Sequence, residues 1–172
     1  MKKLFLLVAT VLCAAAVSAQ TTVDSRVIKV DLGLGSAIGG LPIGASYEQG
    51  IVEFGNGGFI TVGGYLGFCS SSDSYVTYKW KRSQLNIMAQ GNYYLTPLVD
   101  KMDFYAGLRL GYANISSNYV FEDGTKVKYD WGSPFDFSIH IGTNYWFNES
   151  IAVNAELGYG IAYFNIGAAF KF

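Results

Sequence analysis

His140 is the only histidine of the chain, and histidine is the side chain best suited to general acid-base chemistry near neutral pH. Ser138 and Asp136 precede it by two and four residues, so the residue types of a hydrolase triad occur together. On a strand, however, such neighbours lie about 7 and 14 Å apart, which is too far for direct contact. An acyl hydrolase acting on lipid would also need these groups to face lipid, whereas His140 falls on the polar side of its segment. We therefore expect no enzyme.

Ionisable residues of both signs are spread through rows that are otherwise filled by Gly, Asn, Gln, Ser and Tyr. They are Lys29, Asp31, Glu48, Arg109, Asp136, His140 and Glu156. Mixed charges of this kind suit a confined, hydrogen-bonded network that holds neighbouring strands in register. A proton or ion path through the same residues is the alternative. The chain has no Cys/His cluster for structural zinc and no glycine-rich phosphate loop before a helix, so we predict no metal and no cofactor.

The elements that must position these side chains are strands, because apolar residues recur at every second position. The clearest case is residues 135–147, where the odd-numbered positions are Phe, Phe, Ile, Ile, Thr, Tyr and Phe. The pattern and its turn signals predict strands at about 27–37, 43–54, 60–68, 80–95, 104–112, 135–147, 151–159 and 163–172. Residues 70–74, Ser-Ser-Ser-Asp-Ser, are expected to form a solvated loop.

Eight strands of about ten residues match the length that a tilted strand needs to cross a bilayer. The sequence therefore predicts an all-β fold, an eight-stranded antiparallel up-and-down transmembrane β-barrel. Helical spans are excluded after residue 19, since no run of 18 apolar residues follows, although 51% of the chain is hydrophobic.

A soluble, lipocalin-like barrel with its apolar rows inside is the alternative architecture. Only 15% of the residues are charged, whereas a water-facing surface carries charge at about a quarter to a third of its positions. Aromatic residues also gather near the ends of the apolar rows, as in the interfacial girdles of membrane barrels. Both observations favour the membrane barrel.

The N-terminal residues predict a secretory signal peptide. Met1-Lys2-Lys3 is basic, residues 4–12 are apolar, and Val17-Ser18-Ala19 precedes a cleavage site at Gln20. Nine apolar residues rise only about 13 Å as a helix, too little to span a hydrocarbon core of about 30 Å. Leu12 before Cys13 is too bulky for a lipoprotein site. We expect a leader at 1–19 and one barrel domain at 20–172, in which Cys69 has no disulfide partner within the chain.

The final segment places Phe164, Ile166, Ala168, Phe170 and Phe172 on one face. With the leader and the alternating strands, it makes the chain resemble the small eight-stranded bacterial outer-membrane barrels of the OmpA/OmpX-like class and the outer membrane β-barrel domain families.

The resemblance implies a location in the cell outer membrane, in contact with outer-membrane lipids and lipopolysaccharide. It also implies that Tyr163, Phe170 and Phe172 belong to a C-terminal signal read by the barrel assembly machinery. The Gln20-Thr21 start resembles mature ends common in Bacteroidota. Because the class includes adhesion proteins, wall-linked barrels and lipid-modifying enzymes, the fold does not supply a function.

Two segments outside the membrane are candidates for binding. Asp123-Gly124 is a two-residue hairpin signal, so the fifth and sixth strands are expected to continue beyond the membrane, with residues 75–82 pairing beside them. Their aromatic residues are the candidate surface-binding groups: Tyr75, Tyr78, Trp80, Tyr119, Phe121, Tyr129 and Trp131. They could anchor a partner beside an exposed sheet edge, or merely steady the barrel rim among lipopolysaccharide head groups.

The function predicted from the sequence is that of an integral outer-membrane barrel. Its lumen is expected to be filled with side chains, since eight strands enclose little more space than that. Such a protein would serve envelope structure, or bind an extracellular protein or other surface ligand through its outer hairpins. A narrow ion or small-solute channel is the alternative, and a lipid-modifying enzyme is less favoured. Near-equal numbers of basic and acidic residues, 12 and 13, give no field for nucleic acid.

Overall fold

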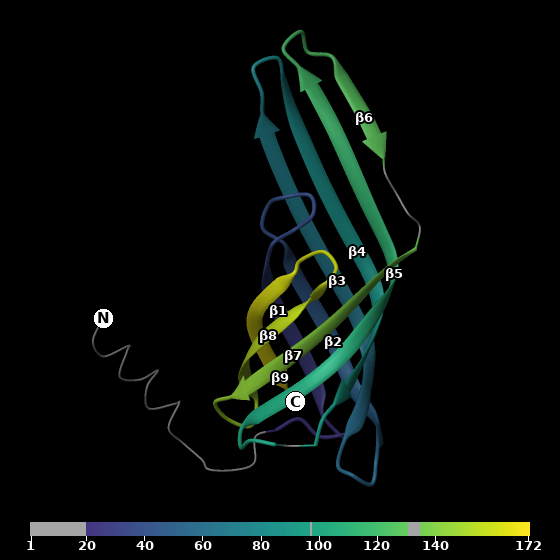
Figure 1. Ribbon diagram of the computed structural model, residues 1–172, viewed down its shortest axis with the longest axis vertical. Coiled ribbons are helices and arrows are strands. Elements are labelled where there is room, and N and C mark those ends of the chain that lie inside the picture. The colour runs from purple at the N-terminus through teal and green to yellow at the C-terminus, as the bar shows by residue number, and fades with distance from the viewer. Residues whose placement is uncertain (1–19, 97, 131–134) are drawn as a thin grey trace, which may run out of the picture.

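The structure is a computed structural model that describes residues 20–96, 98–130 and 135–172 (Figure 1). It contains nine strands: β1 (Arg26–Leu34), β2 (Ile43–Glu53), β3 (Phe59–Ser74), β4 (Tyr78–Tyr94), β5 (Met102–Phe121), β6 (Lys126–Asp130), β7 (Asp136–Trp146), β8 (Ile151–Tyr159) and β9 (Phe164–Lys171). Within these ranges, no helix is long and apolar enough to cross a membrane. The predicted leader at 1–19 lies outside the described residues.

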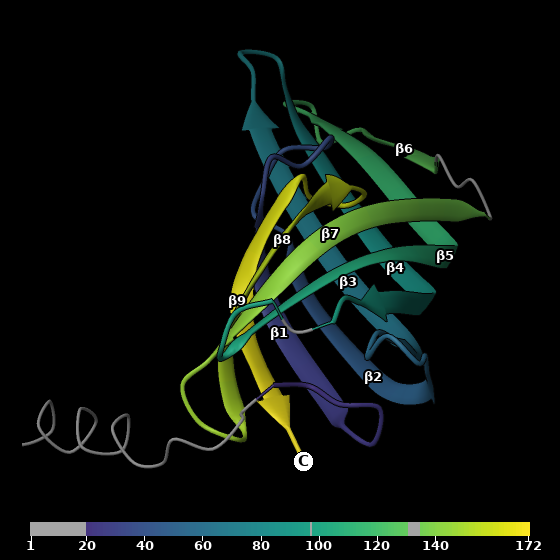
Figure 2. The same ribbon diagram turned by 60° about the horizontal axis from the view of Figure 1, so that its bottom comes forward.

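Eight of the strands form a closed antiparallel ring. The ring runs β1-β2-β3-β4-β5-β7-β8-β9 and returns to β1, because β4 pairs with β5 and β9 pairs with β1. Figure 2 shows the strands curving around a common axis. Of the strands that the structure describes, β6 pairs with the upper part of β5 alone. The predicted eight-stranded barrel is therefore confirmed, with one additional strand outside the ring.

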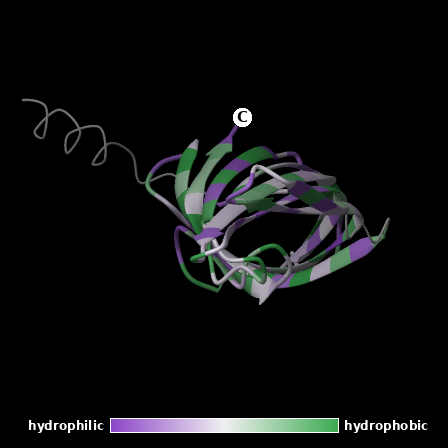
Figure 3. Ribbon diagram, turned by 90° about the horizontal axis from the view of Figure 1, so that it is seen from above, coloured by the Kyte–Doolittle hydropathy of each residue, from purple (hydrophilic) through white to green (hydrophobic). Residues whose placement is uncertain are grey.

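The inner face of the ring is polar and its outer face is apolar, which is the reverse of a soluble barrel. In β1, Lys29 is fully buried and Asp31 is 3% exposed, whereas Leu32 is 50% exposed. The same alternation runs round the ring, and it is visible as bands of contrasting hydropathy in Figure 3. The structure thus contradicts the lipocalin-like alternative, because the apolar rows face outward. Such an exterior is costly in water and favourable in hydrocarbon.

The two ends of the barrel differ. The hairpin end carries the β3–β4 and β5–β6 connections, which rise well above the other strands in Figure 1. The terminal end, opposite to it, carries the start of β1 and the end of β9, where Arg26 and Phe172 exchange two backbone hydrogen bonds of 3.0 and 3.3 Å.

Three strands extend further toward the hairpin end than their apolar patterns predict. The solvated loop expected at residues 70–74 is wrong, because β3 continues to Ser74 and pairs with β4 through Ser74↔Lys79. β4 begins at Tyr78 and β5 continues to Phe121, where these two residues face each other. Backbone hydrogen bonds to a paired neighbour sustain these extensions, so they persist after the apolar alternation stops.

The predicted hairpin at Asp123-Gly124 forms, but its loop has three residues and not two. Phe121 N donates to Thr125 O over 3.0 Å, and Gly124 N donates to Phe121 O over 3.0 Å. Gly124 has a φ of 84°, the left-handed conformation that closes a three-residue hairpin loop. β5 projects beyond the ring as predicted, and its partner there is β6, whereas the predicted sixth strand at residues 135–147 corresponds to β7 of the ring.

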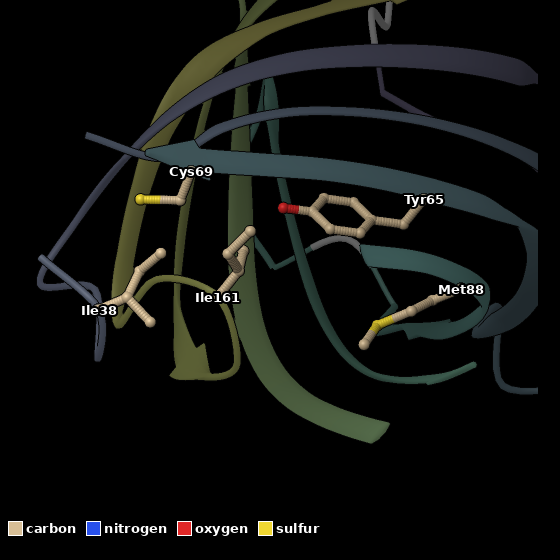
Figure 4. Close-up of a cluster of buried hydrophobic side chains, with 5 residues drawn as sticks. All are labelled: Ile38, Tyr65, Cys69, Met88 and Ile161. Atoms are coloured by element: carbon tan, nitrogen blue, oxygen red, sulfur yellow. The ribbon is translucent and has the colours of Figure 1, made fainter. Parts of the chain in front are cut away.

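Buried apolar clusters lie inside the barrel near both ends. At the hairpin end, Ile38 from the β1–β2 connection and Ile161 from the β8–β9 connection pack with Tyr65, Cys69 and Met88 (Figure 4). At the terminal end, Phe59, Tyr94 and Tyr105 form a second cluster, against which Val23 packs. A third cluster is Val27, Trp146, Ala152 and Ala169. The polar groups of the lumen lie among these clusters.

Candidate functional sites in the lumen and in the projecting sheet

An ion pair joins β1 to β2 inside the lumen. Lys29 Nζ lies 2.7 Å from Glu48 Oε1, and both side chains are 0% exposed. The hydroxyls of Thr61 and Tyr94 and the amide of Asn92 also donate to the Glu48 carboxylate, over 2.6 to 2.7 Å. Glu48 is therefore contacted by four donor side chains from three strands, β1, β3 and β4. A buried carboxylate with this many donors is satisfied and rigidly held.

A second ion pair crosses between β5 and β8. The Arg109 guanidinium lies 2.7 Å from Glu156 Oε2, and its Nε donates to Gln90 Oε1 over 2.9 Å. Tyr105 donates its hydroxyl to the other oxygen of Glu156 over 2.8 Å. Arg109 also lies 4.1 Å from the centre of the Tyr65 ring. The guanidinium thus links the polar network to the apolar cluster at the hairpin end.

His140 connects the two ion pairs and does not form the arrangement of a triad. Its Nε2 lies 2.9 Å from Oδ1 of Asn92, the same residue whose amide donates to Glu48. Its ring meets Tyr105 edge-on, with centroids 6.1 Å apart. Asp136 instead accepts a hydrogen bond of 3.3 Å from Asn86. The structure therefore places His140 in a structural network and leaves Asp136 apart from it.

The seven ionisable residues predicted for the lumen are all on its inner row, but they do not form one group. Lys29, Glu48, Arg109, His140 and Glu156 are joined by the contacts above. Asp31 is buried, yet its Oδ2 has no hydrogen-bond partner among the described residues. Asp136 is only half-buried, near the hairpin end. In the described part of the chain, no three His, Cys, Asp or Glu residues gather as a metal site would require.

One buried carboxylate at the terminal end was missed by the sequence analysis. Asp103 accepts hydrogen bonds from the backbone N and the hydroxyl of Thr21 and, over 2.6 Å, from the indole of Trp146. The alternation could have identified it, since Asp103 shares the inner row of β5 with Tyr105 and Arg109. Its contacts tie the residues just after the expected cleavage site to the barrel.

Beyond the ring, four strands form what we call the projecting sheet: residues 69–74 of β3, 78–84 of β4, 114–121 of β5, and β6. Its registers are continuous, with Asp73↔Trp80↔Tyr119↔Val127 in one line across the sheet. The sheet has two faces. The inner face continues the lumen row of the barrel, and the outer face continues the outward row.

The inner face of the projecting sheet carries an aromatic cluster. Trp80 and Tyr119 stack with centroids 5.6 Å apart and planes 8° apart. The Arg82 guanidinium lies over the Trp80 ring, 4.0 Å from its centroid, and it is ion-paired with Asp73. The Trp80 indole donates to Ser117 Oγ over 2.5 Å. These contacts hold the part of the cluster nearer the barrel in a fixed arrangement.

Nearer the tip, the aromatic residues are more exposed. Tyr78 packs against Tyr75, Tyr119 and Phe121, with centroids 4.8 to 6.1 Å apart. Tyr75 and Tyr129 are each 52% exposed and Phe121 is 38% exposed. Tyr119, Phe121, Val127 and Tyr129 line a cavity of about 390 Å³. The structure therefore brings together six of the seven predicted aromatic residues, and Trp131 lies outside the described residues.

The three residues predicted for the assembly signal lie at the surface around β9. Tyr163 precedes the strand, and its backbone N donates to Leu34 O over 3.1 Å. Phe170 faces outward from β9 and is 43% exposed, and Phe172 is 65% exposed at the terminal end. Phe170 and Phe172 thus form part of the apolar exterior.

No protein-family model and no curated protein matches the chain. Among solved structures, the chain is similar to Ail, the attachment invasion locus protein of Yersinia pestis. The TM-score is 0.56 at 12% identity, over 88% of this chain and 100% of that one. A second structure of Ail, in complex with the heparin analogue sucrose octasulfate, gives a TM-score of 0.55 at 11% identity, over 86% and 97% of the two chains. At this level of identity, the likeness establishes a shared eight-stranded barrel fold.

Proposed function

We propose that this protein is an integral outer-membrane barrel that binds a ligand at the cell surface through its projecting sheet. The observation that carries the proposal is the four-stranded sheet that continues beyond the ring with an aromatic cluster on one face. A purely structural barrel does not need strands that extend seven or more residues beyond its apolar belt. β5 extends this far, from Tyr112 at the edge of the belt to Phe121 at the end of the strand.

The membrane location is supported by the apolar exterior and by the closed ring. Closure leaves no strand edge within the apolar belt, as spanning a bilayer requires. In this proposal residues 1–19 are a secretory leader and residues 20–172 are the barrel. The segment from Tyr163 to Phe172 directs its assembly by the barrel assembly machinery. The barrel then stands among outer-membrane lipids and lipopolysaccharide, with the hairpin end outside the cell.

In this proposal the lumen is a scaffold and not a channel or a catalytic site. The two buried ion pairs join β1 to β2 and β5 to β8, and apolar clusters lie toward both ends. Because His140 contacts Asn92 and not Ser138 or Asp136, nothing in its surroundings activates a nucleophile. A narrow channel, the alternative function, would have to pass between side chains that are mutually paired.

Surface binding is supported by the chemistry of the sheet's tip and edges. Tyr75, Phe121 and Tyr129 are half-exposed, and aromatic residues are frequent anchors of protein interfaces. Among the described strands, β6 is paired only with β5, so its other edge can accept a partner strand. The name of the structurally similar protein refers to attachment, which is consistent with this role.

The test compares two single variants on cells that display the protein. Phe121→Ser removes a tip anchor, whereas Phe54→Ser removes a comparably exposed phenylalanine at the terminal end. Attachment of the cells to cultured epithelial monolayers should fall severalfold for Phe121→Ser and stay unchanged for Phe54→Ser, with equal amounts of heat-modifiable barrel in both. Equal attachment by both variants and the parent, at the level of cells lacking the protein, would contradict the proposal.

A further inference from the structure

A cavity near the tip of the projecting sheet is lined by three aromatic residues and one valine. Tyr119 and Phe121 come from β5, Val127 and Tyr129 come from β6, and the cavity volume is about 390 Å³. The register Tyr119↔Val127 places all four on the inner face of the sheet, because residues two apart on a strand share a face. Phe121 and Tyr129 are 38% and 52% exposed, so a ligand can reach them from solvent. We call this site the tip cavity.

The rings around the tip cavity lie in different planes. Those of Tyr119 and Tyr129 are almost perpendicular, at 85°, with centroids 6.0 Å apart. Tyr78 on β4 packs behind them, with its centroid 5.7 Å from that of Tyr119 and 6.1 Å from that of Phe121. The face of an aromatic ring is electron-rich and attracts a cation within about 6 Å of its centre. Rings that meet at an angle surround one point from several sides, as in the aromatic cages that hold cations.

Other aromatic residues of the inner row contact cations of the chain itself. In the lumen, for example, Lys29 Nζ lies 3.9 Å from the centre of the Tyr105 ring. Among the described residues, no lysine or arginine lies over a ring of the tip cavity. Lys126 and Lys128 flank Val127 along β6, but the alternation of side chains places them on the opposite face of the sheet. The rings of the tip cavity are therefore available to a cation from another molecule.

The lining of the tip cavity favours a cation that needs no hydrogen bonds. A primary ammonium group carries three N–H donors and is strongly hydrated, so it needs several acceptors when it leaves water. The side chains of Phe121 and Val127 have no polar atom, and those of Tyr119 and Tyr129 each supply one hydroxyl. A quaternary ammonium group has no N–H to satisfy. Its charge is attracted by the ring faces, and its methyl groups occupy the apolar space between them.

The surroundings of the tip cavity suit a neutral membrane surface that displays such groups. The β3–β4 and β5–β6 hairpins stand at the far end of the molecule (Figure 1), where β4 and β5 remain paired. Val76 is 90% exposed there and Tyr75 is 52% exposed, and tyrosine is enriched at membrane–water interfaces. Glu122 and Asp123 are exposed in the β5–β6 turn, so an anionic membrane would be repelled. A phosphatidylcholine membrane has no net charge and presents trimethylammonium groups at its surface.

We propose that the tip cavity binds the choline head group of phosphatidylcholine in a membrane that faces the cell. This inference rests on the proposed function and names the class of ligand that the projecting sheet recognises. Each exposed ring beside a cation strengthens binding by about two- to fivefold, so a single site binds weakly. Many copies of the barrel on one cell engage many head groups of the facing membrane, and this multivalency makes the attachment stable.

The first experiment measures binding of free choline to the purified barrel by NMR titration, in a maltoside detergent that contains no choline. The parent should bind choline about tenfold more tightly than 3,3-dimethyl-1-butanol, the uncharged carbon isostere of choline. Phe121→Leu with Tyr129→Leu should weaken choline binding by about tenfold, whereas Tyr129→Phe, which keeps the ring, should bind like the parent. The matched control is Phe54→Leu with Tyr93→Leu, which removes two packed rings at the terminal end and should change nothing. Heat-modifiable migration confirms that each variant is folded.

The second experiment identifies the source of the choline group. Cells that display the parent should bind phosphatidylcholine vesicles severalfold more than vesicles of phosphatidylethanolamine with phosphatidylglycerol. The leucine variant at positions 121 and 129 should lose this preference, and an excess of free choline should abolish it in the parent. A soluble peptide that carries trimethyl-lysine serves as the protein alternative.

Three outcomes would overturn the inference and leave the proposed function standing. The parent could bind choline and its carbon isostere equally, so that the tip cavity is simply apolar. The leucine variant could bind choline as well as the parent does. The parent could bind the trimethyl-lysine peptide but not the phosphatidylcholine vesicles, in which case the partner is a protein. In each case, loss of attachment to epithelial monolayers by Phe121→Ser would still support surface binding through the projecting sheet. A parent chain that remained soluble without detergent would overturn both proposals together.

Discussion

Lys29 and Glu48 form an ion pair of 2.7 Å in which neither side chain has any solvent exposure. The pair connects β1 to β2 beside the β1–β9 seam, where the first and last strands of the ring meet. Burying two charges is unfavourable unless both are fully satisfied. Here Glu48 also accepts hydrogen bonds from Thr61, Asn92 and Tyr94. These contacts can all form only when the strands pair in one register.

The first prediction follows from this pair. Lys29→Met should lower the free energy of unfolding by about 3 to 5 kcal/mol, because it leaves Glu48 as a buried, uncompensated charge. Lys29→Met with Glu48→Gln should recover much of the loss, since neither charge then remains. Urea titration of the barrel folded into lipid vesicles measures both, and Asp24→Asn at the exposed N-terminal segment is the control. If the single variant lowered the free energy of unfolding by less than about 1 kcal/mol, Glu48 would not be a buried charge that depends on Lys29.

The lumen network also predicts how the protein behaves in a planar bilayer. If the lumen is the scaffold proposed above, the parent should show no reproducible unitary conductance, because the paired side chains and apolar clusters would block the path. Arg109→Ala with Tyr65→Ala, which removes the guanidinium and the ring that it contacts, should raise ion leakage. A stable conductance in the parent that disappeared on changing Arg109 or Glu156 would instead establish the narrow channel.

The β5–β6 turn predicts a pH dependence in the projecting sheet. The backbone N of Thr125 donates to the Asp123 carboxylate over 2.8 Å, and this hydrogen bond lowers the pKa of Asp123 below its ordinary value of 3.8. Because the folded pKa is depressed, the stabilisation is complete above pH 3.8 and is lost as the pH falls through the lowered value. The amide protection factors of β6, which allow for the intrinsic pH dependence of exchange, should therefore fall below pH 3.8.

Asp123→Ala is the matched variant for that experiment. It should exchange faster than the parent at neutral pH and show no further change on acidification. The barrel strands, which do not depend on this turn, should keep their protection throughout. An identical acid response in parent and variant would show that Asp123 does not stabilise the turn.

The sequence predicted the ring well and the projecting sheet in part, for physical reasons. The alternation of apolar and polar residues identifies a strand wherever its two faces contact different surroundings. In β1, for example, Lys29 faces the lumen and Leu32 faces outward. In Ser70 to Ser74, both faces are polar, so the extension of β3 leaves no such trace. The pairing of Tyr78 with Phe121 depends on contacts between distant segments, which only the fold provides.

The candidate site shows the same limit. Five of the seven lumen residues form one network, because a shared inner row brings them together across strands. Asp31 and Asp136 share that row but differ from the others in their position along the barrel axis and in their neighbours. Knowing which face of a strand a residue occupies does not specify either property.

The central claim is a barrel in the outer membrane with its projecting sheet outside the cell, and cysteine labelling tests it most directly. One variant is Val76→Cys, at the tip of the β3–β4 hairpin, where Val76 is 90% exposed. The other is Asn56→Cys, in the β2–β3 turn at the terminal end. The native Cys69 is buried. On intact cells, a membrane-impermeant maleimide should label position 76 at once and position 56 only after the outer membrane is permeabilised. Labelling of both positions to the same extent on intact cells, or of position 56 alone, would contradict the account.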